Sequence, residues 1–405
     1  MRGKKMDGFP TREQALKDFF EVWAPNDGIE YVPLAEAEGR VTAKTLRSIN
    51  TLPVYRVSSC DGIAVKSADF ENAFPDYGKW ILNKDFCRAD TGDDFPDEYD
   101  AVIMIEEVDL TDDGTITFIS PDITVKAGTN VTPRGSSIQE GDLLIEENMP
   151  IRPQDMAALA MGGISMIPVW RKPKVAFIPT GSELIPYGVT PARGQNIDTN
   201  SLFVYRELLN MGAEPLIFPL SADDPKLLEQ RIDEALTSAD LIILNAGSAK
   251  GSEDFNFGIL GNRGRLVHHY IAAAPGRPMA MGVVNGKPVI NLSGPSIAAF
   301  YGMKWCVRAA VNRWLHKPAH KLPTVKGRLM DDFESGASMA LLCMMHVVKT
   351  NGNYEIYPIK MSKNRSPRLL TANACYISDV GEEGRSKGEI IEVELTRDDE
   401  FIGES

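Results

Sequence analysis

The strongest constraint on the fold is a regular alternation of apolar strands and amphipathic helices over residues 172–317. The segments "KVAFIPTG", "PLIFPL", "DLIILNAG" and "KPVINLSG" are typical of buried strands, and segments of helical periodicity separate or follow them. The last of these, "SIAAFYGMKWCVRAAVNRWL", predicts one long helix. Strands joined through helices favour right-handed crossovers and a parallel sheet with helices on both faces. We therefore expect a three-layer, parallel-sheet α/β domain.

The segments on either side of this domain follow other patterns. Apolar residues at helical spacing after Thr11 predict a helix over residues 12–23, and "YVPLAEAEGRVTAKTL" predicts a second helix. Short apolar runs between residues 52 and 168 are separated by Gly, Pro and Asp and predict a β-rich module. "RPQDMAALAMGGISMIPVW" predicts a short helix, a glycine stop and a strand. After the linker-like "HKPAHKLP", strand-like runs predict a terminal β-domain.

These patterns divide the 405 residues into four parts, as expected for a chain well above the usual size of one domain. We predict a multidomain α/β protein with an elongated, discontinuous N-terminal helical or linker domain, an inserted β-rich module, the α/β domain and a C-terminal domain that resembles a β-barrel. The respective boundaries are 1–50 with 147–171, 51–146, 172–317 and 318–405.

The composition excludes several classes of function. A net charge of -13 repels a polyphosphate backbone, so sequence-independent binding to DNA or RNA is not expected. No apolar run has the length of a membrane span, and no signal-peptide pattern is present. The five cysteines are scattered and never form a C-x-x-C pair, which is typical of reduced thiols. We expect a cytoplasmic protein with neither a nucleic-acid partner nor a membrane partner, and no histidine-ligated metal site.

Three loops rich in small residues follow strands of the α/β domain: "PTGSEL", "NAGSAKGSEDF" and "LSGPS". In a parallel sheet, ligands collect beyond the carboxyl ends of the strands, where small residues let an anion approach backbone N–H groups. The carboxylates Glu183 and Asp254 suit Mg²⁺ held against a phosphate. The loops match neither the dinucleotide nor the P-loop motif. Each loop alone is ordinary turn chemistry, but three at one sheet edge indicate a phosphate or pterin site.

Longer stretches carry a resemblance to a known family. "LPVYRVSSCDGIAV", "TGDDFPDEYDAVIMIEE", "AGTNVTPRGSSIQEGDLLIEENMPIRPQDMAALAMGGISMIPVW" and "LLTANACYISDVGEEGRSKGEIIEVEL" resemble, in this order, the MoeA/gephyrin E-domain family of molybdopterin molybdenumtransferases. The resemblance covers nearly the whole chain. It implies a MogA-like α/β domain, the insertion of molybdate into adenylated molybdopterin with Mg²⁺-dependent release of AMP, and possible contacts with other proteins of molybdenum cofactor biosynthesis. It also implies a homodimer whose active cleft lies between the two subunits.

The resemblance and the three loops together define the expected site. The expected catalytic residues are Asp61, Glu183, Asp254 and Arg277, of which Glu183 and Asp254 would bind the metal. The expected substrate-binding residues are Thr91, Glu106, Thr180, Gly181, Asp198, Asn200, Gly247, Lys250, Gly251, Pro275, Gly276 and Gly294. Local roles stay open for three of them: Asp198 as a helix cap, Thr180 as a turn former and Asp61 as a cap of a bulge.

Several residues in these same loops differ from those of the family pattern. Ala246 replaces a glycine, Ser252 an aspartate and Ala274 a lysine, and Ser293 lies in an altered "SGPSI". Lys250 is an added cation that would compensate for the charge lost at Ala274. Losing an aspartate and a lysine from a site of preorganised charges typically costs several kcal/mol of transition-state stabilisation. Two alternatives therefore stay open: a diverged paralogue that binds a pterin as carrier, scaffold or regulator, and an enzyme that inserts another oxyanion such as tungstate.

Overall fold

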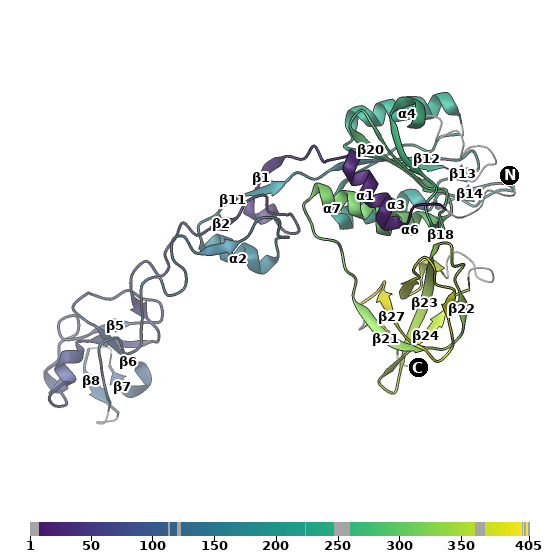
Figure 1. The fold of residues 1–405 in the computed structure, drawn as a ribbon. Coiled ribbons are helices and arrows are strands. Elements are labelled where there is room, and N and C mark those ends of the chain that lie inside the picture. The colour runs from purple at the N-terminus through teal and green to yellow at the C-terminus, as the bar shows by residue number, and fades with distance from the viewer. Residues whose placement is uncertain are drawn as a thin grey trace. The chain divides into compact units, whose positions relative to one another are not determined.

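The chain forms two compact units joined by a pair of strands. The computed structural model describes residues 8–111, 114–119, 123–222, 224–246, 260–360, 369–398, 400 and 402–403. One unit contains the chain up to Ile29 and from Trp170 onward, and the other is Glu30–Val169 (Figure 1). The chain passes between the units through β1 (Ile29–Pro33) and β11 (Met166–Trp170), which pair with each other. No helix among the described residues is long and apolar enough to cross a membrane.

A six-stranded sheet forms the centre of the first unit, in the order β15-β12-β16-β20-β19-β17. Four strands run parallel: β15 (Glu214–Ile217), β12 (Lys174–Thr180), β16 (Leu241–Ala246) and β20 (Lys287–Ser293). At the other edge, β19 (Ala280–Val284) pairs antiparallel with β20, and β17 (Arg265–His269) pairs antiparallel with β19. The expectation of a parallel sheet is therefore wrong at this edge. The reason is a tight hairpin between β19 and β20, where Asn285 and Gly286 both adopt the positive φ that such a turn requires.

Helices cover both faces of this sheet, so the predicted three layers are present (Figure 1). On one face lies α4 (Pro225–Ser238), whose buried Leu228 and Ile232 belong to the same hydrophobic cluster as Ile178 and Leu244 of the sheet. The other face carries α1 (Arg12–Val22), α3 (Asn200–Met211), α6 (Ser296–Gly302) and α7 (Arg308–Trp314).

Helix α1 begins where the sequence predicts it. Thr11 is the N-cap, and its side-chain oxygen accepts a hydrogen bond of 3.2 Å from the backbone N–H of Gln14. The helix packs on β17 and β19, with Ala15 and Phe19 fully buried. The structure therefore places this helix with the α/β sheet, whereas the sequence analysis grouped it with the N-terminal domain.

The predicted long helix after β20 is continuous but not regular. A π-helical turn, Met303–Val307, separates α6 from α7. Such turns are rare and are frequent at functional sites.

The second unit is rich in β-structure. Its central strand β4 (Gly62–Val65) pairs antiparallel with β5 (Cys87–Ala89) and β6 (Ala101–Met104), and Ile63, Phe86 and Ile103 belong to its core. The remaining pairs are β2 (Leu46–Arg47) with β10 (Leu143–Ile145), β3 (Val57–Ser58) with β9 (Val131–Thr132), and β7 (Val108–Leu110) with β8 (Ile116–Phe118). Short 3-10 helices are η2 (Ser67–Phe70), η3 (Tyr77–Lys79) and η4 (Ile105–Glu107), and α2 (Pro153–Met161) is the predicted short helix.

The second helix predicted for the N-terminal part, over residues 31–46, is wrong. These residues form the end of β1, one 3-10 turn η1 (Leu34–Glu36), isolated bridges and the start of β2. Their backbone N–H groups bond to distant partners, such as Gly39 to the Ile151 carbonyl and Ala43 to the Pro168 carbonyl. Pairing with distant segments thus overrides the local helical pattern, and Gly39 adopts a positive φ that a helix does not allow.

The C-terminal part is a closed five-stranded barrel, as predicted. Its strands are β23 (Ala340–Thr350), β24 (Asn353–Pro358), β21 (Thr324–Leu329), β27 (Ile390–Leu395) and β25 (Ala374–Ile377), and β25 pairs back onto β23. Met345, Val347 and Ile356 lie in its core. Strand β18 (Ala273–Ala274) extends from the α/β domain and joins the edge of β23, while β22 (Phe333–Glu334) pairs with β26 (Gly384–Arg385).

Candidate active site

The three loops singled out in the sequence start from one edge of the sheet. Thr180 of β12 is the register partner of Ala246 in β16, which is in turn the register partner of Ser293 in β20. The parallel strands therefore end level with one another, as the alternating pattern predicts. The predicted site residues Gly247, Lys250, Gly251 and Asp254, and the altered Ser252, lie outside the described residues.

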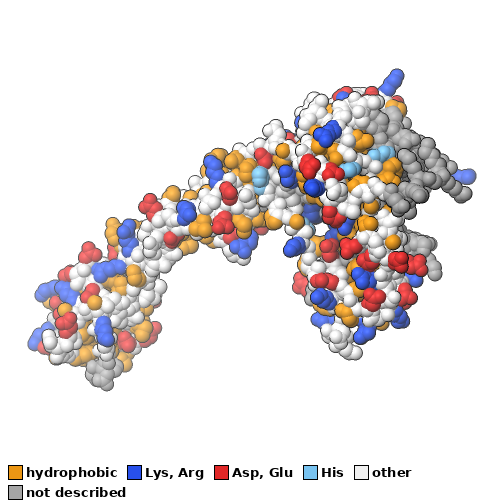
Figure 2. Space-filling model, viewed as in Figure 1, with side chains coloured by type: hydrophobic (Ala, Val, Ile, Leu, Met, Phe, Trp, Pro, Cys, Tyr) orange, Lys and Arg blue, Asp and Glu red, His pale blue; other side chains and the backbone are white. Residues whose placement is uncertain are grey.

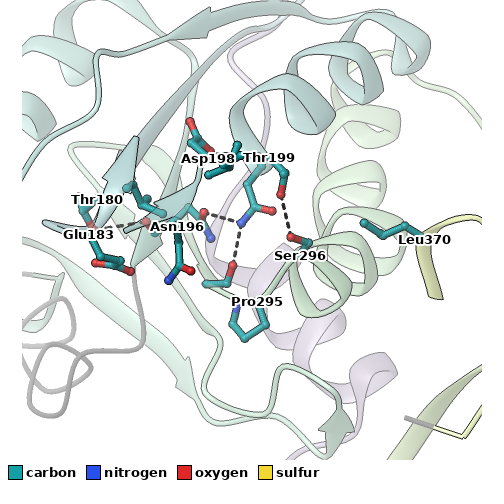
Figure 3. Close-up of a pocket in the computed structure, with 13 residues that line it drawn as sticks. Thr180, Glu183, Asn196, Asp198, Thr199, Pro295, Ser296 and Leu370 are labelled. Carbon is teal, nitrogen blue, oxygen red and sulfur yellow. Dashed lines mark hydrogen bonds between the residues drawn. The ribbon is translucent and has the colours of Figure 1, made fainter. Parts of the chain in front are cut away.

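A cavity of about 470 Å³ lies at this edge (Figure 3). Its volume falls within the range of small-molecule sites. Five predicted site residues line it: Thr180, Glu183, Asp198, Asn200 and Gly294. The sequence analysis missed the other lining residues, which are Leu184, Asn196, Ile197, Thr199, Asn245, Pro295, Ser296 and Leu370.

Two buried side-chain amides connect the walls of the cavity. The side-chain nitrogen of Asn200 donates to the side-chain oxygen of Asn245 at 2.9 Å and to the Gly294 carbonyl at 2.7 Å. Asn245 donates its own side-chain N–H to the Ser293 carbonyl at 3.1 Å. The start of α3, the end of β16 and the loop after β20 are thereby held together. Asn245 had a signal in the sequence, because it is a polar residue at the end of the apolar run "LIIL".

Two helix starts meet at the cavity. Helix α3 begins at Asn200 and the helical segment of α6 and α7 begins at Ser296. The hydroxyl oxygens of Thr199 and Ser296, just at these starts, lie 2.8 Å apart (Figure 3). Helix N-termini carry unpaired N–H groups and the positive end of the helix dipole, which favours anions such as phosphate. The two helix starts therefore favour an anion at the cavity, while two carboxylates, Glu183 and Asp198, also line it.

Asp198 has a local structural role. Its carboxylate accepts a hydrogen bond of 3.0 Å from the backbone N–H of Ser201 and so caps the first turn of α3. Only 7% of the residue is exposed, although it lines the cavity. The capping alternative raised for this residue is therefore present in the structure. Thr180 is also locally engaged, since its hydroxyl donates to the Asn245 carbonyl at 3.3 Å.

Glu183 is held over the cavity by a short strand pair, β13 (Leu184–Ile185) with β14 (Asn196–Ile197). The Glu183 carbonyl accepts the backbone N–H of Asn196 at 2.8 Å. Gly181 makes the preceding turn possible, because a Cβ atom there would lie 2.8 Å from Cγ of Leu184. The backbone therefore places the half-buried Glu183 carboxylate at the cavity.

The described residues do not by themselves form a magnesium site. No group of three His, Cys, Asp or Glu side chains in the described part of the chain could hold a metal. The cavity offers two carboxylates, Glu183 and Asp198, and Asp198 already caps a helix. The other predicted ligand, Asp254, is outside the described residues, so we derive no chemical step through the metal.

The loop of residues 274–278, "APGRP", which contains the predicted Pro275, Gly276 and Arg277, lies beside α6 and does not line the cavity. A Cβ atom at Gly276 would lie 3.5 Å from Cβ of Ala298 in α6. Arg277 is exposed, with its guanidinium carbon 5.7 Å from the ring centroid of Tyr270. The cavity described here therefore does not bring Pro275, Gly276 and Arg277 together with Glu183. Conversely, Leu370 reaches the cavity from the C-terminal part of the chain, and nothing in the sequence indicated it.

The predicted residues of the second unit form a group of their own. The Asp61 carboxylate accepts hydrogen bonds from the backbone N–H of Thr91 at 2.7 Å and from its hydroxyl at 2.8 Å. These two bonds hold the pKa of Asp61 below its usual value. Burial, and then the nearby charges of Glu106 and Asp61, raise the pKa of the Cys60 thiol. Asp61, Thr91 and Glu106 are all exposed, so this acidic group is open to a ligand.

Comparison with known proteins identifies the family. The model of the MoeA N-terminal region (domain I and II) matches residues 11–163, and that of a probable molybdopterin binding domain matches residues 176–313. A molybdopterin molybdenumtransferase from Haemophilus influenzae is 28% identical over 95% of this chain and 98% of its own length. The chain belongs to the MoeA family.

Further relatives agree with this MoeA assignment. A molybdopterin molybdenumtransferase from Bacillus subtilis is 25% identical over 91% of this chain and 90% of its own length. The crystal structure of a molybdopterin biosynthesis MoeA protein from Pyrococcus horikoshii superposes with a TM-score of 0.80 at 26% identity, covering 96% of this chain and all of that one. This chain therefore has the MoeA fold over nearly its whole length.

Proposed function

We propose that this MoeA-family protein acts in molybdenum cofactor biosynthesis as a molybdopterin molybdenumtransferase. It inserts molybdate into adenylated molybdopterin and releases AMP. The observation that carries the proposal is the cavity of about 470 Å³ where the ends of β12, β16 and β20 meet two helix starts. Such a cavity suits a phosphorylated heterocycle, and the relatives from Haemophilus influenzae and Bacillus subtilis bear the name of this activity.

The residues of the cavity suggest separate roles. The N–H groups at the start of α6, which lies at the cavity wall, bind a phosphate group, whereas the first turn of α3 is already capped by the Asp198 carboxylate. The amides of Asn200 and Asn245 fix the wall against which the substrate rests. Glu183 is the cavity carboxylate that does not cap a helix, and it orients a water whose oxygen attacks the phosphate of the adenylate, so that the P–O bond between molybdopterin and AMP breaks and AMP leaves. Magnesium remains part of this proposal, with Glu183 and Asp254 as its ligands.

A homodimer with a shared cleft is the second part of the proposal. The group of Asp61, Thr91 and Glu106 is exposed and acidic, which suits a role in completing a neighbouring subunit's cavity. Mixing two inactive variants, Asp61→Ala and Glu183→Gln, tests this. If each cleft combines the two units from different subunits, mixed dimers contain one intact cleft, and about a quarter of the wild-type activity returns. A mixture that stays inactive, with mixed dimers verified by mass spectrometry, contradicts the shared cleft.

The deciding experiment for the activity is an AMP-release assay. Purified protein with adenylated molybdopterin, Mg²⁺ and molybdate should release AMP and yield active cofactor. Bound pterin without AMP release would favour the carrier, scaffold or regulator alternative. The same assay with tungstate decides between the oxyanions, because a remodelled oxyanion site predicts a clear preference for one of them. The cytoplasm remains the proposed location, and the five cysteines are all free in the structure, as a reducing compartment would leave them.

A further inference from the structure

One side chain from the C-terminal part of the chain reaches the cavity at the end of the sheet. Among the described residues that line this cavity, Leu370 is the only one outside residues 180–296. It lies in the sequence between the barrel strands β24 and β25. Its side chain is apolar and 42% exposed, so a ligand in the cavity can reach it. The proposed function assigns no role to Leu370.

Exposure alone does not make Leu370 a ligand contact. Figure 2 shows hydrophobic side chains among charged ones over the visible surface of the protein. Single exposed apolar residues of this kind are normal and need no explanation. What distinguishes Leu370 is where its backbone is held and what lies beside its side chain.

The backbone that follows Leu370 is fixed to the barrel. The buried side chain of Asn373 accepts the backbone N–H of Val347 in β23 at 2.8 Å and donates to the Val347 carbonyl at 2.7 Å. The Thr396 hydroxyl donates to the Ala372 carbonyl at 2.7 Å. These three hydrogen bonds hold the short segment that carries Leu370 against the barrel, so the side chain is presented from a fixed position.

The barrel is in turn fixed to the α/β domain. Strand β18 pairs parallel with β23, and the backbone N–H of Ala340 in β23 donates to the Ala272 carbonyl at 2.9 Å. Lys304, which follows α6, pairs with Glu394 of β27, with Nζ 2.5 Å from Oε2. The α/β domain and the barrel belong to one compact unit. The packing of the barrel therefore sets the position of Leu370 at the cavity.

The two ends of the cavity differ in chemistry. In Figure 3, Leu370 and Glu183 lie at opposite ends, with Ser296 on the side of Leu370. The Glu183 end provides a carboxylate. The other end provides the start of α6 at Ser296 together with the apolar surface of Pro295 and Leu370. A ligand whose phosphate lies at the start of α6 therefore has apolar surface beside that phosphate, which favours an uncharged ring there.

We propose that Leu370 is a specificity-determining residue that packs against a heterocyclic ring of the substrate, next to the phosphate at the start of α6. This inference rests on the proposed function, which supplies the phosphate and the ring. The adenine and the pterin of the substrate are both flat heterocycles, and either satisfies the same contact. A ligand with a ring removes the apolar surface of Leu370 from water, whereas a phosphate without a ring leaves it exposed.

Isothermal titration calorimetry of the full-length protein tests the proposal with three probes. AMP and 6-hydroxymethylpterin phosphate each carry a ring and a phosphate, and ribose 5-phosphate carries the phosphate without the ring. The wild type should bind at least one ring probe more tightly than ribose 5-phosphate. Leu370→Ala should weaken the binding of that probe about tenfold, the value of roughly two methylene groups lost from contact, and leave ribose 5-phosphate unchanged. The probe that loses affinity identifies the ring.

Further variants separate a ligand contact from an effect on the fold. Leu370→Met keeps an apolar side chain of similar volume and should bind the ring probe as the wild type does. Leu370→Gln keeps the length without the apolar surface and should lose affinity as Leu370→Ala does. Val380→Ala is the matched control, since Val380 is 44% exposed in the same part of the chain and does not line the cavity. Thermal unfolding checks that each variant is folded.

Three results would overturn the role of Leu370. They are a wild type that binds neither ring probe more tightly than ribose 5-phosphate, variants Leu370→Ala and Leu370→Gln that bind all three probes as the wild type does, and an equal loss for all three probes. Failure of the proposed function gives a different result. A protein that binds a ring probe through Leu370 but releases no AMP from adenylated molybdopterin retains this contact without the activity.

Discussion

Asn200 and Asn245 fix each other's orientation across the end of the sheet, with the side-chain nitrogen of one 2.9 Å from the side-chain oxygen of the other. Asn245 must present its oxygen to Asn200, because its own NH₂ group donates to the carbonyls of Leu292 and Ser293. Asn200 then has its NH₂ group facing Asn245 and the Gly294 carbonyl. Three segments that are distant in sequence are joined by two side chains.

Replacing Asn200 should disturb this connection. Asn200→Leu keeps a side chain of similar size but leaves the Asn245 oxygen and the Gly294 carbonyl without their donor. We expect the free energy of unfolding to fall by about 1–3 kcal/mol, the cost of unsatisfied buried acceptors. Thermal unfolding measures the change. Asn196→Leu is the matched control, since Asn196 lines the same cavity but is exposed, and a drop of equal size there would contradict the explanation.

Removing the charge of Glu183 should affect the reaction and not the fold. Glu183→Gln preserves the shape of the side chain, so thermal unfolding should stay as in the wild type. The rate of AMP release should fall by about a hundredfold or more, as is typical when a group that stabilises the transition state is lost. Glu214→Gln, an exposed carboxylate on β15, serves as the control. A Glu183→Gln protein with an unchanged rate would show that this carboxylate takes no part in the reaction.

Gly62 should tolerate no side chain. A Cβ atom at this position would lie 1.9 Å from the carbonyl oxygen of Ile103 on the neighbouring strand, and backbone cannot yield as a side chain does. We expect Gly62→Ala to destabilise the β-rich unit by about 3 kcal/mol or more. Hydrogen exchange of β4 and β6 reports the loss. Gly78→Ala, where the nearest atom would be 3.8 Å away, should change the stability little, and equal effects at both glycines would refute the steric reason.

The hydrogen bonds of Thr91 should make Asp61 a stronger acid than usual. Because the pKa of Asp61 is lowered in the folded state from its ordinary value of 3.8, these bonds contribute stability above that pH and lose it as the pH falls through the folded pKa. NMR titration should give a value below 3.8. Thr91→Ala removes the hydroxyl donor but keeps the N–H, so the pKa should rise part of the way back. Thr117→Ala, at the exposed position of β8, should leave the titration unchanged.

The sequence predicts best what depends on local patterns. The buried strands β12, β16 and β20 and the N-cap at Thr11 follow from apolar periodicity and capping chemistry, and the level strand ends follow from parallel pairing. Thr180, Glu183 and Gly294 of the cavity were found because they lie in the loops at those ends, whereas Asp198 and Asn200 were supplied by the family resemblance. The hairpin at Asn285–Gly286 also had a clear signal, which was not used.

What the sequence could not predict depends on contacts between distant segments. Leu370 reaches the cavity from a part of the chain with no signal of its own, and Arg277 lies in a family motif but does not line the cavity. The pattern over residues 31–46 favours a helix, yet those backbone groups bond to residues 149–151 and 168 instead. The family resemblance supplied Gly276 and Arg277 as candidate site residues. Their loop, residues 274–278, packs against α6 and does not line the cavity, and this depends on tertiary packing that the sequence does not show.

The pairing of β1 with β11 has a consequence for how this protein can change. The chain leaves the α/β core at Ile29 and returns at Trp170, and the backbone N–H of Arg171 bonds to the Gly28 carbonyl at 2.8 Å. Exit and return are thus adjacent, and a turn of a few residues can replace everything in between. The inserted unit, Glu30–Val169, can therefore be deleted or replaced by another domain without breaking the chain of the α/β sheet or of the barrel.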